Sequence, residues 1–193
     1  MSSVNLPPLP PVGGETTGRN VIDVLNQQHR ELISLGDQLA RSPEDRKLRS
    51  VVIASLSRHL SAEEQYLYPA IRAAVPGGGE LADRELGEDH TLLVLLKDLE
   101  KGAAIEKEVA EAVRRHVAAD EEELLPVLAA MVPIEDLIRV GNRVELAEEA
   151  APTRPHPGTP SAPPWNKIVD PAVAVVDKLR DVVTRRTTYL SDL

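Results

Sequence analysis

The stretch HLSAEEQYLYP at residues 59–69 recurs as HVAADEEELLP at residues 116–126. Each copy begins with a histidine, carries adjacent acids four and five residues later, and ends in a proline. Because residues four apart lie on one face of a helix, each histidine points the same way as the first acid of its copy. An imidazole and a carboxylate one turn apart are two donors for a metal ion. The repeat therefore predicts two metal-binding half-sites on two helices.

A further histidine precedes each copy. His29 lies 30 residues before His59, and His90 lies 26 residues before His116. Leucine follows each upstream histidine at the sixth position and aspartate at the eighth. A histidine helix followed by a helix with a histidine and an acid therefore occurs twice. Four such helices can form an antiparallel bundle with approximate two-fold symmetry, in which the half-sites face each other in the core.

This arrangement resembles the hemerythrin-like (HHE cation-binding) domain family over about residues 18–150. The family's signature is one histidine, a histidine with an acid four residues on, another histidine, and a second histidine–acid pair. The resemblance implies an all-α fold, an up-down-up-down four-helix bundle that holds a non-heme di-iron centre. The ligands that it implies are His29, His59, Glu63, His90 and His116, with Asp120 or Glu121 as the second acid.

One position departs from hemerythrin itself, which has a fifth histidine four residues after the histidine of its third helix. Val94 stands at that position. The chain therefore resembles the four-histidine branch of the family. We expect the metal beside Val94 to be open to a small oxidant, which favours peroxide chemistry over simple reversible carriage of oxygen.

The prolines that end the two copies affect the choice of acid. A proline inside a helix cannot bond the carbonyl four residues earlier, which belongs to Gln65 in the first copy and to Glu122 in the second. The resulting distortion could turn the fifth-position acid inward, whereas an ideal helix favours the fourth-position acid. We favour Glu63 in the first copy. In the second copy Asp120 and Glu121 stay open, with a preference for Glu121 because its side chain reaches further.

Composition limits the class of protein. Aromatic residues make up 2% of the chain and phenylalanine is absent, so the core must consist of Leu, Val, Ile and Ala, which suits packed helices. A formal net charge of −9 without a dominant basic run argues against nucleic acid as a partner. The lack of cysteine excludes disulfides and thiolate ligands. No signal peptide and no apolar run of ~20 residues is apparent, so we expect a cytoplasmic protein without membrane contact.

The four bundle helices are expected from near Arg19 onward. Ser42, followed by a proline, is expected to be the N-cap of the second helix, which continues to about Val75. The third helix is expected over about 80–101, with Leu86, His90 and Leu93 facing inward. The fourth is expected over about 104–131, and a short fifth helix over about 134–149.

The ends of the chain differ from the bundle in composition. Residues 1–17 form a Pro- and Gly-rich arm that we expect to be disordered. Residues 151–165 are a Pro-rich linker, and residues 166–193 form a tail with an amphipathic helix at about 171–186. That tethered helix, whose end is basic, could dock on the bundle, dimerise, or contact a partner protein or an anionic membrane.

The ligand count suggests the chemistry. By pseudo-symmetry one iron would take His29 and His59 and the other His90 and His116, with two carboxylates and an oxo or hydroxo group bridging them. Imidazole and carboxylate also suit manganese or zinc, so iron follows from the resemblance. Each metal would keep one position for dioxygen, hydrogen peroxide or nitric oxide. Three functions fit: binding or sensing of such molecules, catalase-like disproportionation of peroxide in a stress response, and a metal-dependent interaction module without turnover.

Overall fold

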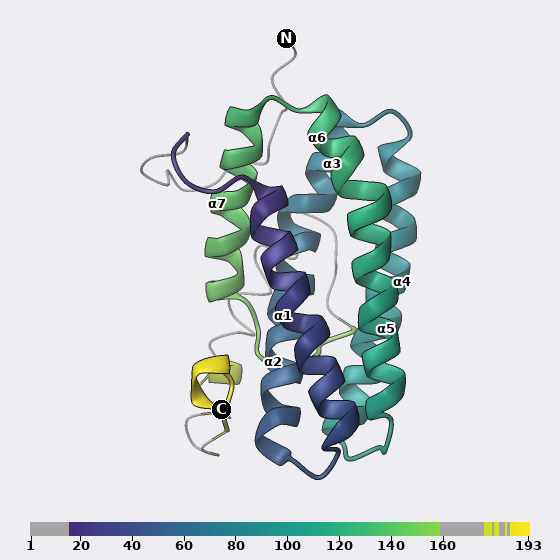
Figure 1. Ribbon diagram of the computed structural model, residues 1–193, viewed down its shortest axis with the longest axis vertical. Helices are drawn as coiled ribbons and strands as arrows, with labels where there is room; N and C mark the ends of the chain where they lie inside the picture. Colours follow the sequence, from purple (N-terminus) through teal and green to yellow (C-terminus); the bar gives the residue numbers. More distant parts are fainter. Residues whose placement is uncertain (1–15, 159–175, 179, 182–183, 185) are drawn as a thin grey trace.

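A computed structural model describes residues 16–158, 176–178, 180–181, 184 and 186–193. Within these residues the regular structure is entirely helical, which confirms the predicted all-α bundle (Figure 1). The elements are α1 Val21–Arg41, α2 Arg46–Ala62, η1 Glu63–Leu67, α3 Tyr68–Ala74, α4 Gly78–Glu100, α5 Glu106–Ala119, η2 Asp120–Leu124, α6 Leu125–Met131, α7 Ile134–Ala150 and the 3₁₀ turn η3 Leu190–Asp192. The bundle consists of four helical rods that run side by side: α1, α2 continued by α3, α4, and α5 continued by α6. The second and the fourth rod are each interrupted by one π-helical turn, η1 and η2.

Short polar segments set where the rods begin and end. The Asn20 side chain accepts a hydrogen bond from the backbone N–H of Asp23 at 3.0 Å and caps α1. Asp45 caps α2 by accepting two backbone N–H bonds, so the prediction that Ser42 is this cap was wrong. Ser42 instead ends α1, because its N–H bonds the last carbonyls of that helix. Gly77, with φ at 73°, makes the reversal between α3 and α4 that the sequence predicted.

The two π turns lie where the sequence predicted distortion. Pro69 and Pro126 have no N–H, so each interrupts the regular bonding of its helix. The N–H of the residue before each proline bonds instead to the carbonyl five residues back, that of Glu63 in η1 and that of Asp120 in η2. Each acid therefore opens a wider turn, and both side chains are fully buried.

Helix α4, the third rod, is rotated about its own axis by one residue relative to its predicted orientation. Its buried positions are Ala82, Glu85, Asp89, Leu92, Leu96 and Leu99. His90 is exposed, and Val94 is 39% exposed, so the prediction that His90 and Val94 face the core was wrong. One residue corresponds to about 100° of helical rotation. The apolar run at residues 92–96 covers most of the helix circumference, so its periodicity does not select a face.

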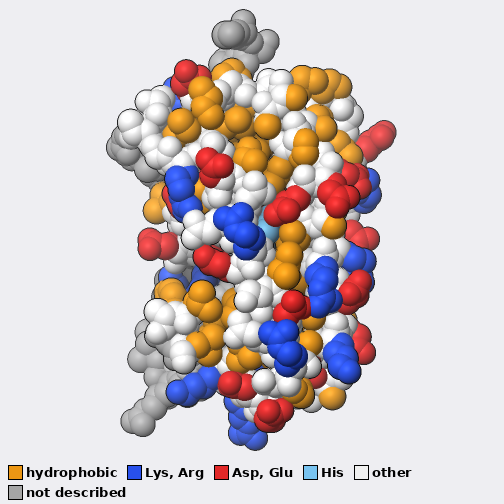
Figure 2. Space-filling view, in the orientation of Figure 1, with side chains coloured by type: hydrophobic (Ala, Val, Ile, Leu, Met, Phe, Trp, Pro, Cys, Tyr) orange, Lys and Arg blue, Asp and Glu red, His pale blue; other side chains and the backbone are white. Residues whose placement is uncertain are grey.

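The fifth helix, α7, lies beside α1 and α2, within a residue of its predicted bounds (Figure 1). A Cβ on Gly141 would lie 2.5 Å from the Arg19 carbonyl oxygen, so a glycine is needed for this close crossing. Over the face formed by α1, α5 and α7, acidic and basic side chains are interspersed, without a large area of one sign (Figure 2). None of the described helices is long and apolar enough to cross a membrane.

The C-terminal segment packs on the bundle. Residues 151–155, the first part of the predicted linker, are buried. Arg154 donates to Asp181 at 2.7 Å, and Arg58 of α2 donates to the Thr188 carbonyl at 2.7 Å. The predicted helix over 171–186 falls mostly outside the described residues, although residues 176–178 are helical. The arm at residues 1–17 also falls outside them except at its last two residues, and the domain boundaries stay predictions.

The apolar core is divided into two layers. One layer joins the start of α1 to α3, α6 and α7, and the other joins the end of α1 to α2, α4 and α5. Buried polar residues lie between them, at the height where α1 carries His29 and the two π turns begin. This polar level is where the candidate site is built.

Candidate metal centre

Five buried side chains meet at the polar level of the bundle. Each offers one nitrogen or oxygen, and these five atoms all lie within 4.8 Å of one another. The members are His29 of α1, His59 of α2, Glu63 of η1, His116 of α5 and Asp120 of η2. Three rods of the bundle thus supply imidazoles, and the two π turns supply the carboxylates.

The distances between the donor atoms match ligands around an ion. The Nε2 atoms of His59 and His116 lie 3.1 Å apart. Glu63 places Oε1 at 3.3 Å from the first of these nitrogens and Oε2 at 3.3 Å from the second. Asp120 Oδ2 lies 3.5 Å from His29 Nε2. Bonds of about 2.1 Å would separate adjacent ligands by roughly 3.0 Å and opposite ligands by roughly 4.2 Å. The five donors are therefore already spaced for one ion.

The outward nitrogen of each imidazole has its own polar neighbour. His29 Nδ1 lies 3.2 Å from Glu121 Oε1, and His59 Nδ1 lies 3.0 Å from the Gln28 carboxamide oxygen. His116 Nδ1 lies 3.2 Å from Asp89 Oδ1. An oxygen beside Nδ1 favours a proton on that nitrogen and an Nε2 lone pair available to a metal. All three Nε2 atoms face the cluster, which is the orientation that a metal requires.

Several of the inward atoms have no hydrogen-bond partner among the described residues. They are His29 Nε2 and both carboxylate oxygens of Glu63 and of Asp120. A buried polar atom without a partner is costly, and a buried carboxylate more so. A cation at the centre would give all five atoms a partner, so these residues fit a bound metal ion.

Without a cation, protons take its place. Burial opposes a charge on His29, but its contacts with Asp120 and Glu63 outweigh burial and raise its pKa to about 9. Burial likewise opposes ionisation of Glu63, yet His116 and His29 lower its pKa to about 2. Burial and the two neighbouring imidazoles keep the pKa of His59 well below its usual value. An arriving cation must therefore displace protons from the cluster, which ties metal binding to pH.

Comparison with known proteins agrees with this geometry. Residues 20–128, more than half of the chain, match the family described as the hemerythrin HHE cation binding domain. The chain belongs to this family. The chain is also 24% identical over 177 residues to an uncharacterized hemerythrin-like protein of Schizosaccharomyces pombe, covering 86% of this chain and 87% of that protein. No solved structure matches the chain.

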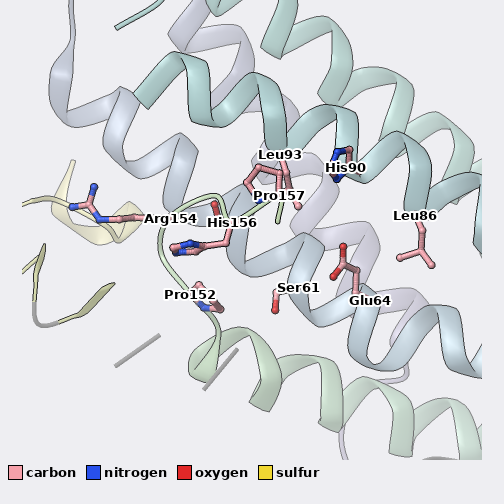
Figure 3. Close-up of a pocket in the computed structure, with 10 residues that line it drawn as sticks. Ser61, Glu64, Leu86, His90, Leu93, Pro152, Arg154, His156 and Pro157 are labelled. Atoms are coloured by element: carbon pink, nitrogen blue, oxygen red, sulfur yellow. The ribbon is translucent and has the colours of Figure 1, made fainter. Parts of the chain in front are cut away.

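The hemerythrin domain brings together five of the seven residues predicted as ligands. Glu121 lies outside the cluster, with its side chain 40% exposed and against His29. Asp120 is the acid that points inward, contrary to the preference for Glu121, because the π turn begins at Asp120 and leaves its neighbour on the outer side. His90 lies in a surface pocket with Glu64, between α2, α4 and residues 152–157 (Figure 3).

The residues that the sequence did not identify act around the cluster. Asp89 takes the inward position of α4 and accepts a hydrogen bond from the Tyr68 hydroxyl at 2.6 Å. Gln28 links His59 to Glu148, which accepts from its amide at 2.6 Å. Glu85 lies one turn before Asp89 and is also buried. Glu85 and Asp89 are four residues apart and so share one face of α4, which was a usable signal, whereas Gln28 carried none.

Proposed function

We propose that this hemerythrin domain binds iron at the five-residue cluster and that the iron binds or reacts with small oxidants: dioxygen, hydrogen peroxide or nitric oxide. The observation that carries the proposal is the set of inward atoms without a hydrogen-bond partner, which are His29 Nε2 and the carboxylate oxygens of Glu63 and Asp120. The outward nitrogens of the three imidazoles lie against Glu121, Gln28 and Asp89. Such an arrangement would lower the stability of the fold if its role were purely structural. A role in oxidative or nitrosative stress would follow from this chemistry.

The donor set guides the choice of metal. Imidazole with carboxylate suits iron, and also manganese and zinc, while the cluster has no thiolate that would favour softer ions. When bound, iron supplies a change of oxidation state and a coordination position for an oxidant. We choose iron because the resemblance to the hemerythrin family implies it and because the five nitrogen and oxygen donors suit that ion.

The number of ions depends on α4. As they stand, the five donors enclose one ion. The second ion predicted from the sequence would have to draw on Asp89, since His90 lies at the surface. One iron per chain would indicate the five-donor site alone, and two would indicate that Asp89 takes the place predicted for His90.

The residues of the domain have definite tasks in this function. The three imidazoles bind the ion through Nε2, and Glu63 presents one oxygen to each of two imidazoles. Leu60 and Leu124, both fully buried, belong to the two apolar layers on either side of the cluster. Asp89, fully buried, places Oδ1 3.2 Å from His116 Nδ1 and so keeps a carboxylate against the outward side of that imidazole.

A sensing or interaction module without turnover is the second candidate, and one contact favours it. Arg58, adjacent to His59, donates to the Thr188 carbonyl and lies 4.7 Å from the centre of the Tyr189 ring. A structural change at the metal could therefore be transmitted through Arg58 to the C-terminal segment, where a partner protein would bind. Turnover of peroxide by the isolated protein would decide for the enzyme over this module.

Metal analysis of the purified chain tests the proposal. We expect at least one iron per chain, with a near-ultraviolet charge-transfer band, and loss of most of the iron in His59→Ala and in His116→Ala. The reduced protein should bind nitric oxide or consume peroxide. Full iron loading in the double variant would refute the site. Manganese as the native ion would refute the choice of iron, and zinc, which has no redox chemistry, would refute the oxidant chemistry.

A further inference from the structure

A pocket of about 360 Å³ opens between α4 and α5 and reaches the cluster. Its wall includes Arg84, Glu85, Thr91, Ala112, His116 and Glu123. His116 is one of the five candidate ligands, so this pocket reaches one residue of the cluster. A water molecule occupies about 30 Å³, so the pocket has room for several small molecules in file.

The inner end of the pocket also carries an unpartnered acceptor. Glu85 is 1% exposed. Its Oε1 accepts a hydrogen bond from Arg84 at 2.8 Å, while its Oε2 is buried and has no partner among the described residues. A buried acceptor without a partner is stabilised by any molecule that can donate a hydrogen bond to it. Because Glu85 lines the pocket, a molecule inside the pocket can supply that bond.

The mouth is crossed by one side chain. Arg84 joins Glu85, at the inner end, to Glu123 of η2, which it contacts at 2.6 Å. Its side chain is 47% exposed, and Glu88, Thr91 and Arg115 complete the rim. The lining carries the carboxylates of Glu85, Glu88 and Glu123 together with the guanidinium groups of Arg84 and Arg115, so charge alone selects little between a small anion and an uncharged molecule.

Another cavity serves this purpose less well. The cleft between α1 and α7 is larger, at about 610 Å³, but it ends at Gln28 and Glu148. Gln28 contacts the outward nitrogen of His59, so a molecule in that cleft meets a carboxamide and not the inward donors. Of these two pockets, only the one between α4 and α5 combines a candidate ligand in its wall with a buried acceptor that has no partner among the described residues.

We propose that hydrogen peroxide reaches the metal centre through the pocket between α4 and α5, and that Glu85 Oε2 binds it there by accepting a hydrogen bond. Peroxide is uncharged and carries two O–H donors, which matches the unpartnered oxygen, whereas dioxygen and nitric oxide have no proton to donate. This inference deepens the proposed function and rests on it. It selects peroxide among the small oxidants by the chemistry of one side chain.

Substitution of Glu85 tests the binding role. In the iron-loaded, full-length protein, Glu85→Leu removes the acceptor at similar volume, and Glu85→Gln keeps an oxygen acceptor. We expect Glu85→Leu to slow the stopped-flow reaction of the reduced protein with hydrogen peroxide by about tenfold, the effect of one lost hydrogen bond, and Glu85→Gln to restore most of the rate. The association rate of nitric oxide should stay at the wild-type value in both variants. Equal slowing of peroxide and nitric oxide, or no slowing of peroxide, would overturn the role of Glu85.

Blocking the mouth tests the path. Thr91 is exposed on the rim, so Thr91→Trp should narrow the pocket without disturbing the core, and Ile134→Trp on α7 adds the same ring at an exposed site elsewhere. We expect Thr91→Trp alone to slow both peroxide and nitric oxide. Radiolytic hydroxyl-radical labelling of the metal-free protein, read by peptide mass spectrometry, should show less labelling of His116 in this variant.

The kinetic and the labelling experiments distinguish failure of the proposed function from failure of the proposed path. A protein without iron would refute the proposed function, while the labelling of His116 would still report whether the pocket leads to the cluster. Unchanged labelling together with unchanged ligand rates in Thr91→Trp would overturn the path. Slower nitric oxide binding in Thr91→Trp with normal peroxide kinetics in Glu85→Leu would leave the path in place and remove the selection of peroxide.

Discussion

Tyr68→Phe isolates the outer support of the metal centre. The Tyr68 hydroxyl donates to Asp89 at 2.6 Å, and both side chains are fully buried. The substitution leaves one carboxylate oxygen of Asp89 without a donor, at a cost of about 1–3 kcal/mol. For a protein of this size, a loss of about 2 kcal/mol lowers the melting temperature by roughly 4–8 °C.

The same change should weaken metal binding, because Asp89 orients His116 through its Nδ1 atom. Burial raises the pKa of Asp89 to about 6, while the contacts with His116 and Tyr68 oppose that rise, so loss of the hydroxyl makes Asp89 a poorer partner. We expect metal affinity to fall about 10–100-fold, as for other residues that orient a ligand. Chelator competition measures the affinity, and thermal unfolding of the metal-free protein measures the stability.

A matched variant makes the result interpretable. Tyr66→Phe also removes a largely buried phenol hydroxyl, from the same π turn that carries Glu63, but not the one that contacts Asp89. Its metal affinity should equal that of the wild type. The reasoning fails if Tyr68→Phe unfolds at a lower temperature and yet binds metal as tightly as the wild type, since Asp89 would then support the fold and not His116.

Three further outcomes are expected. His90→Ala should keep its full metal content, measured by elemental analysis, because His90 lies at the surface; a loss of metal would mean that α4 rotates when the ion binds. Val94→His should leave the optical spectrum and the melting temperature nearly unchanged, since the side chain is 39% exposed, and a new ligand band would show that it does reach the metal. The pKa of His29 is raised to about 9 in the metal-free protein, so its stabilising charge is fully present below pH 6.5 and is lost as the pH rises through 9. Urea unfolding from pH 6 to pH 9 should thus show falling stability without metal, and calorimetric metal titration should show protons released on binding; a flat profile would contradict the protonated cluster.

The repeated motif was enough to predict most of the bundle and of the cluster. His59 and Glu63, like His116 and Asp120, are four residues apart, and helical geometry alone places each pair on one face. The opposing prolines also predicted the distortion that became η1 and η2. These features are local, so they can be deduced from spacing.

The remaining parts depended on contacts between distant segments. The predicted orientation of α4 was wrong because residues 92–96 are all apolar and so do not favour one face of the helix. The inward face is selected instead by the contacts of Asp89 with Tyr68 and His116 on other rods. The choice between Asp120 and Glu121 depended on where the π turn starts, which a proline six residues later does not fix. Neither the inward face of α4 nor the start of the π turn can be deduced from the few residues of one helical turn.

The polar level between the two apolar layers has a consequence for cooperativity. Each layer has its own set of leucines and valines, and the rods that join them pass through a level where burial of charge opposes folding. In the metal-free chain the two halves should therefore open as partly separate units, with amide exchange at residues 26–31 and 114–121 faster than in the flanking turns. A bound cation would join the halves into one cooperative unit. The ion would then set the mechanical integrity of the bundle as well as its chemistry.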